Sequence, residues 1–101
     1  MVSAGQVERV AALLDERFGL DALWIFGSEA RGTATEASDV DLAALFVRRP
    51  PTIEVLDARD AAGRVLGRDV DLVDLDRASP ILAMQVLRHG RPVVDRNPSR
   101  R

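Results

Sequence analysis

The sequence predicts an α/β (α+β) fold, a small mixed β-sheet flanked by helices. Short apolar runs of strand length alternate with longer segments in which apolar residues recur every three or four positions, so helices separate most of the strands. Glycine or proline stands at most of the boundaries between these segments, where both residues end regular structure. With 101 residues the chain is long enough for one core and too short for two. We expect residues 1–96 to form one domain and residues 97–101 to be a flexible tail.

The first third of the chain is expected to contain a helix, a strand and a short second helix. An apolar stripe along residues 3–18 predicts an amphipathic helix that ends at Gly19. Residues 20–26 are the next apolar run, which is typical of a strand buried on both faces. Residues 29–36 favour a short helix or a helical turn whose length is limited by Gly32.

The middle of the chain is expected to hold two strands joined by a helix. Residues 39–47 predict a strand that ends before two consecutive prolines, which cannot continue a ladder. Residues 53–66 predict a helix with Thr52 as its cap. Residues 67–76 alternate acidic and apolar side chains, which is typical of a half-buried strand.

The last two elements are a helix and a short strand. Ser79 followed by Pro80 predicts a capped helix start, and Gly90 predicts its end. Residues 91–94 then favour a strand at an edge of the sheet, because Pro92 has no N–H to donate.

Composition excludes several classes of function. The chain has no cysteine, which rules out disulfides and thiolate metal sites, and its fourteen basic residues are all arginine, which rules out lysine chemistry. No apolar run approaches the roughly 20 residues of a membrane helix. The first residues lack the features of a signal peptide, so we expect a cytoplasmic protein that does not bind membranes.

The chemistry is predicted to lie between residues 27 and 45. Gly27-Ser28 ends the first apolar run and offers a turn whose N–H groups and hydroxyl can approach a phosphate. Asp39 and Asp41 begin the next strand, where residues two apart point to the same face. Such a pair is half of a site for a hard divalent cation. The alternative is that both acids merely line a solvent-exposed face, although the Gly-Ser turn upstream favours a site.

A third carboxylate is expected from the strand at residues 67–76. If this strand lies beside the second one, Asp71 stands next to Asp39 and Asp41, and three clustered carboxylates are expected to hold a cation. Two Mg²⁺ ions would suit phosphoryl or nucleotidyl transfer. Asp69 has the same parity as Asp71 and is the rival ligand.

The pattern G-S-x10-D-x-D, followed by A-R-G and later V-D-L-V, resembles the minimal nucleotidyltransferases of the DNA polymerase beta superfamily. The resemblance implies the polymerase beta-like nucleotidyltransferase fold, with Gly27 and Ser28 on the triphosphate and Asp39 and Asp41 as metal ligands. It favours Asp71 over Asp69 as the third carboxylate. Many relatives are antitoxins encoded beside a HEPN-domain ribonuclease toxin, and some silence the toxin by transferring AMP from ATP to a tyrosine.

The roles of two further side chains are interpreted from their surroundings. Arg31 of the A-R-G motif is expected either to contact phosphate or to form a structural salt bridge with a nearby acid. His89 lies in the last turn of a predicted helix, where a cation suits the helix dipole, and is interpreted as structural.

Two hypotheses of function follow. The first is a magnesium-dependent protein adenylyltransferase that uses ATP and inactivates a HEPN toxin bound as a hetero-oligomer. The second is a non-catalytic antitoxin that neutralises its toxin by binding alone. Direct nucleic-acid binding is disfavoured by the net charge of -2 and by the absence of tyrosine.

Overall fold

A computed structural model describes residues 2–35 and 38–96. Its elements follow the order α1 (Ala4–Phe18), β1 (Leu20–Phe26), α2 (Ser28–Arg31), β2 (Val40–Phe46), α3 (Thr52–Leu66), β3 (Val70–Asp74), α4 (Pro80–His89) and β4 (Arg91–Asp95). The strands form one sheet in the order β3-β2-β1-β4. Strand β1 runs antiparallel to β2 and β4, whereas β2 and β3 are parallel, so the prediction of a mixed sheet is confirmed.

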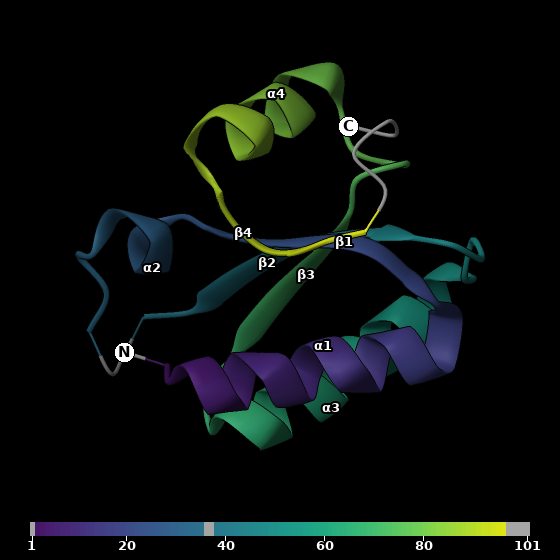
Figure 1. The fold of residues 1–101 in the computed structure, drawn as a ribbon, viewed down its shortest axis with the longest axis horizontal. Helices are drawn as coiled ribbons and strands as arrows, with labels where there is room; N and C mark the ends of the chain where they lie inside the picture. The colour runs from purple at the N-terminus through teal and green to yellow at the C-terminus, as the bar shows by residue number, and fades with distance from the viewer. Residues whose placement is uncertain (1, 36–37, 97–101) are drawn as a thin grey trace.

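The sheet separates two layers of helices. Helices α1 and α3 cover one face and α4 lies over the other, while α2 sits at one end of the sheet (Figure 1). The core between the sheet and α1 and α3 contains Val40 and Leu42 of β2. A smaller core under α4 contains Trp24, Ala43 and Val86. Residues of β1 and β2 contribute to both cores, so the prediction that β1 is buried on both faces is confirmed.

Local sequence signals explain most helix ends. Ser3 caps α1 by accepting a hydrogen bond from the N–H of Gln6, whose side chain accepts one from the N–H of Ser3. Ser79 caps α4 in the same way through the N–H of Leu82, and Pro80 opens that helix as predicted.

The start of α3 differs from the prediction. The cap position is Pro51, and Thr52 is the first helical residue rather than the cap. The Pro51 carbonyl accepts hydrogen bonds from the N–H groups of Glu54 and Val55, so the backbone provides the cap without a side chain. Proline suits this place because its fixed φ directs the chain into the first turn.

Two predicted elements are longer than the observed ones. Helix α2 ends at Arg31, because Gly32 adopts a left-handed conformation with φ 74° and closes the turn on the carbonyls of Ser28 and Glu29. Gly32 therefore limits the helix as predicted, but residues 33–35 are not helical, so the predicted element is longer than the observed one. Residues 36–37, where the prediction ended, lie outside the described part. Strand β3 is limited to the five residues that pair with β2.

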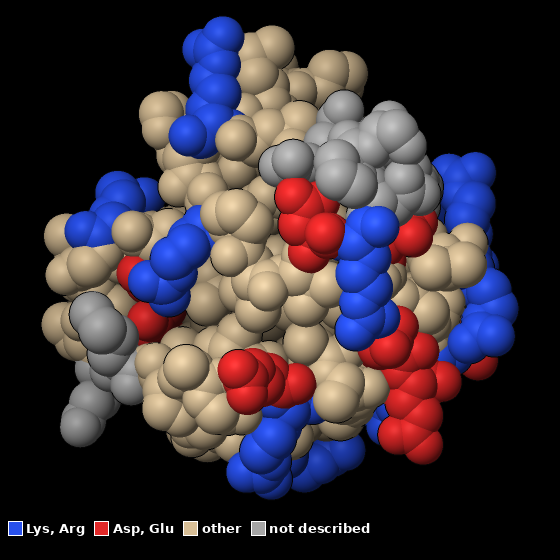
Figure 2. Space-filling view, in the orientation of Figure 1, with Lys and Arg blue, Asp and Glu red and all other residues tan. Residues whose placement is uncertain are grey.

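The end of the chain follows the prediction where the structure describes it. Strand β4 is an edge strand that pairs with β1. The predicted tail at residues 97–101 lies outside the described residues. None of the described helices has the length and apolar character required to cross a membrane. On the face shown in Figure 2, arginine and acidic side chains are interspersed and neither sign forms a continuous patch.

Candidate active site

Two of the predicted carboxylates come from neighbouring positions of adjacent strands. In the parallel pairing of β2 with β3, Asp41 lies directly opposite Asp71. On its other side Asp41 pairs with Phe26, the last residue of β1 before the Gly27 turn. Since side chains in register project from the same face of a sheet, Asp41 and Asp71 share one face. The order of the strands therefore brings a carboxylate pair beside the Gly-Ser turn.

The pair points to the side of the sheet covered by α4. Val40 and Leu42 are buried in the core on the opposite side, and alternation turns the intervening Asp41 away from that core. Asp39 has the same parity but lies one residue before β2, where it is exposed. The predicted strand began at Asp39, so the hydrogen-bonded ladder starts one residue later than expected.

The charges of Asp39, Asp71 and Arg31 all act on the carboxyl group of Asp41. Burial raises the pKa of the Asp41 carboxyl above its usual range, and the charges of Asp71 and Asp39 raise it further, while Arg31 acts in the opposite direction. A carboxylate that is partly desolvated and surrounded by like charges is stabilised by a bound cation. The oxygen donors of Asp41 and Asp71 fit a hard divalent ion such as Mg²⁺.

The convergence of all three carboxylates stays a prediction. Within residues 2–35 and 38–96, no three His, Cys, Asp or Glu side chains form a compact set of metal ligands. Asp69 lies just before β3, is exposed, and uses its carbonyl to accept a hydrogen bond from the N–H of Val40. Asp71, unlike Asp69, therefore lies in register with Asp41, and its role as the third carboxylate stays a prediction.

The Gly27 turn packs directly against the carboxylate of Asp41. Gly27 has φ 68° and ψ -145°, a conformation that is accessible to glycine and strained for other residues. A Cβ atom built at this position would collide with Asp41 Oδ2. The glycine thus allows the turn that carries Ser28 to approach the carboxylate pair closely. Ser28 itself is half-buried at the start of α2.

A cavity of about 710 Å³ opens beside this turn. Its lining residues come from the end of β1, from α2, from β2 and from α4: Phe26, Gly27, Arg31, Asp41, Gln85 and His89. Pockets for small molecules commonly measure about 300–1,000 Å³. The cavity therefore has the size and the mixed polar lining of a small-molecule site.

Helix α4 adds two side chains that sequence reasoning did not place at the site. Sequence patterns predict a structural role for His89 and no role for Gln85, yet both line the cavity beside Asp41. The spacing of four residues between them, which places them on one side of a helix, was the available signal. Arg31 also lines the cavity and has no ion-pair partner within 4.0 Å in the described part of the chain, so the alternative of a structural salt bridge is not observed.

The chain is similar in sequence to known proteins. The sequence profile of the family described as polymerase beta, nucleotidyltransferase matches residues 8–99. The chain is 36% identical over 72 residues to protein adenylyltransferase MntA of Shewanella oneidensis, a match that covers 71% of this chain and 52% of that protein. It is 37% identical over 75 residues to MntA of Thermococcus cleftensis, covering 74% and 76% of the two chains. The chain thus spans about half the length of the Shewanella relative.

Solved structures show the same fold. A chain in a crystal structure of a toxin-antitoxin with AMP-PNP has a TM-score of 0.86 and 28% identity, over 97% of this chain and 77% of that one. A structure of the tri-AMPylated Shewanella oneidensis HEPN toxin with its MNT antitoxin gives a TM-score of 0.75 and 27% identity, over 89% and 70% of the two chains. These similarities confirm the predicted fold class. In this fold, the end of β1 and the starts of β2 and β3 lie together at one end of the sheet.

Proposed function

The chain belongs to the polymerase beta nucleotidyltransferase family, and from this membership we propose that it is an antitoxin that transfers AMP from ATP to a tyrosine of a HEPN-domain toxin. The observation that carries the proposal is the register of Asp41 with Asp71 beside the Gly27 turn. The relatives named protein adenylyltransferase, together with the neighbouring structure of an AMPylated toxin bound to its antitoxin, support the reaction and the partner.

We assign a role to each residue of the candidate site from its place around the Gly27 turn and the cavity. Asp41 and Asp71, with Asp39 beside them, hold Mg²⁺, and two ions are expected. Bound Mg²⁺ supplies charge neutralisation for the triphosphate and for the transition state of nucleotidyl transfer. Gly27 and Ser28 bind the phosphates through N–H groups and the serine hydroxyl, and the Arg31 guanidinium adds donors from the cavity wall.

The reaction is a substitution at the α-phosphorus of ATP. The tyrosine hydroxyl of the toxin gives up its proton to the Asp71 carboxylate, and its oxygen forms the new O–P bond. The bond between the α-phosphorus and the bridging oxygen breaks, and pyrophosphate leaves. We assign to Asp71 the activation of the tyrosine hydroxyl, because it stands on the strand next to Asp41 and faces the same side of the sheet. Its exposed fraction suits contact with an incoming acceptor.

The test is mass spectrometry of the purified toxin after incubation with ATP, Mg²⁺ and this protein. Wild type is expected to add AMP to a tyrosine, whereas Asp71→Asn and Asp39→Asn, which keep side-chain volume and remove a charge, lower the transfer rate by orders of magnitude. Asp69→Asn is the matched control, since it removes the same charge two residues from Asp71, and it should retain most of the activity. Loss of transfer in Asp69→Asn with retention in Asp71→Asn would reverse the assignment.

A second candidate is an antitoxin that acts by binding alone. It is favoured by exposed apolar side chains on α4, where Ile81, Met84 and Leu87 are 71%, 52% and 44% exposed. Apolar patches of this kind commonly mark protein interfaces. The two candidates are separated in cells that express the toxin: rescue by wild type, Asp39→Asn and Asp71→Asn alike, without AMP on the toxin, would establish binding and refute catalysis.

A further inference from the structure

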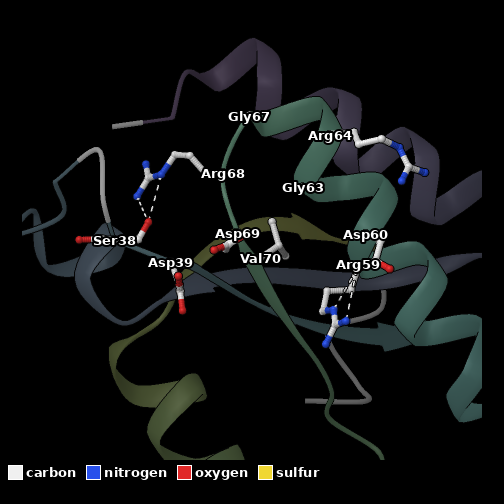
Figure 3. A pocket seen from close by; sticks show the side chains of 10 residues that line it. All are labelled: Ser38, Asp39, Arg59, Asp60, Gly63, Arg64, Gly67, Arg68, Asp69 and Val70. Atoms are coloured by element: carbon white, nitrogen blue, oxygen red, sulfur yellow. Dashed lines mark hydrogen bonds and ion pairs between the residues drawn. The ribbon is translucent and has the colours of Figure 1, made fainter.

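An arginine far from Asp39 in the sequence holds the chain segment that leads into it. Arg68 lies between α3 and β3, and its guanidinium donates to the carbonyl of Ser38 from Nε at 3.1 Å and from Nη2 at 2.5 Å. Nη2 also donates to the carbonyl of Thr35 at 3.0 Å. Figure 3 shows Arg68 reaching across to Ser38, with Asp39 and Asp69 beside them. One side chain thus binds both described residues that flank positions 36–37.

The opposite side of the guanidinium is fixed by a buried ion pair. Arg68 Nη1 lies 2.5 Å from Glu29 Oε1, and the side chains are 11% and 0% exposed, respectively. Glu29 directly follows Ser28, the proposed phosphate ligand, so the ion pair joins the Gly-Ser turn to the start of β3. Buried charges need such pairing, because a lone charge in the interior is strongly destabilising.

Asp39 depends on these contacts more than Asp41 or Asp71 does. Asp41 and Asp71 lie within paired strands, whereas pairing of β2 with β3 begins at Val40. Asp39 is held from one side by the bond between the Val40 N–H and the Asp69 carbonyl, at 2.9 Å. On its other side the carbonyl of Ser38 is held by Arg68. The same hydrogen-bonded region therefore fixes the backbone on both sides of Asp39.

We infer that Arg68 is a positioning residue: it sets where the Asp39 carboxylate lies relative to Asp41 and Asp71, and it couples that position to the Gly-Ser turn through Glu29. The inference rests on the proposed function, since it takes Asp39 as a metal ligand. Residues that orient metal ligands from outside the ligand set affect metal affinity by about 10–100-fold. Arg68 holds the backbone next to Asp39 rather than its carboxylate, so we expect the lower end of that range.

The variants are chosen so that the protein stays folded. Removing Arg68 alone would leave Glu29 charged and buried without its partner. Glu29→Gln also removes one charge of the pair, but the Arg68 guanidinium is partly exposed and keeps oxygen acceptors in the glutamine amide and in the carbonyls of Thr35 and Ser38. Glu29→Gln combined with Arg68→Met removes both charges of the pair and preserves the net charge of the chain. Arg64 lines the same pocket as Arg68, Ser38 and Asp39, but its side chain points away from Ser38 (Figure 3). Arg64→Met is therefore the matched control, because it removes a nearby guanidinium that does not bind this segment.

Two measurements on metal-free and Mn²⁺-loaded protein test the inference. Amide hydrogen exchange at Ser38 and Val40 should be faster in the double variant than in Glu29→Gln, and unchanged in Arg64→Met. Binding of Mn²⁺ in the presence of ATP, followed by electron paramagnetic resonance, should weaken by about tenfold in the double variant relative to Glu29→Gln. Arg68→Lys, which keeps the charge but has fewer donors, should fall between wild type and the double variant.

The outcomes separate the inference from the proposed function. Equal exchange rates in Glu29→Gln and the double variant would overturn the inference. Faster exchange with unchanged Mn²⁺ affinity would make Arg68 structural and would overturn it as well. If wild type binds no Mn²⁺ with ATP, the proposed function fails in its metal site, and the exchange rates alone decide whether Arg68 holds the segment at Ser38.

Discussion

Replacing Gly27 by alanine tests the close approach of the Gly-Ser turn to Asp41. The backbone conformation at φ 68° and ψ -145° costs about 1–3 kcal/mol for a residue with a Cβ atom. The new Cβ also collides with Asp41 Oδ2, and overpacking of this kind costs about 1–3 kcal/mol more. We therefore expect Gly27→Ala to lower the free energy of unfolding by about 2–6 kcal/mol.

Three further variants separate backbone strain from the collision: Gly32→Ala, Asp41→Ala, and Gly27→Ala combined with Asp41→Ala. Gly32→Ala also places a Cβ at positive φ, 74°, but nothing lies within 4 Å of it, so its cost should be about 1–2 kcal/mol. In an Asp41→Ala background the carboxyl group is gone, and the alanine at 27 would meet the Cβ of residue 41 at 3.5 Å, an ordinary contact. There the cost of Gly27→Ala should fall to the strain alone, about 1–3 kcal/mol.

The assay is urea denaturation of all five proteins at 25 °C and pH 7 without metal, read as a double-mutant cycle. A coupling free energy of about 1–3 kcal/mol between positions 27 and 41 is expected. A Gly27→Ala variant that costs no more than Gly32→Ala, and that costs the same with and without the Asp41 carboxyl group, would show that the turn does not pack on Asp41. The geometry on which the candidate site is built would then be wrong.

Three other predictions concern the same site. Ser28→Ala should weaken ATP binding in the presence of Mg²⁺ by about fivefold, since one neutral hydrogen bond contributes about 1 kcal/mol and the backbone donors remain; calorimetry showing a complete loss of binding would contradict this reasoning. Gln85→Ala should weaken ATP binding by a similar factor because Gln85 lines the cavity, and an affinity equal to wild type would remove α4 from the nucleotide site. Asp41→Asn should raise the free energy of unfolding of the metal-free protein at pH 7, because burial and the charges of Asp71 and Asp39 raise the pKa of the Asp41 carboxyl. That gain should shrink as the pH falls through the raised folded-state pKa and vanish below the ordinary value, where Asp41 is protonated in both states; a thermal denaturation midpoint at pH 7 no higher than that of wild type would count against it.

The sequence by itself determined the elements and the faces of the strands, because these depend on neighbours within a few residues. Ser3 and Ser79 cap the helices that follow them, and Gly19 and Gly90 end those helices. The alternation of Val40, Asp41 and Leu42 assigned one face to the core before any partner strand was known. Local signals were weakest at Thr52 and at the end of α2, where the backbone itself provides the cap or the turn.

The tertiary structure decided which of these residues meet. The parallel pairing of β2 with β3 places Asp71, rather than Asp69, opposite Asp41. Packing of α4 on the sheet brings Gln85 and His89 to the cavity beside Asp41. No pattern in the sequence pairs Glu29 with Arg68, which are separated by 39 positions. Contacts between residues so far apart in the sequence depend on how the apolar faces of the elements pack together. They also depend on which oppositely charged side chain the fold places beside a buried charge. Both are properties of the whole fold.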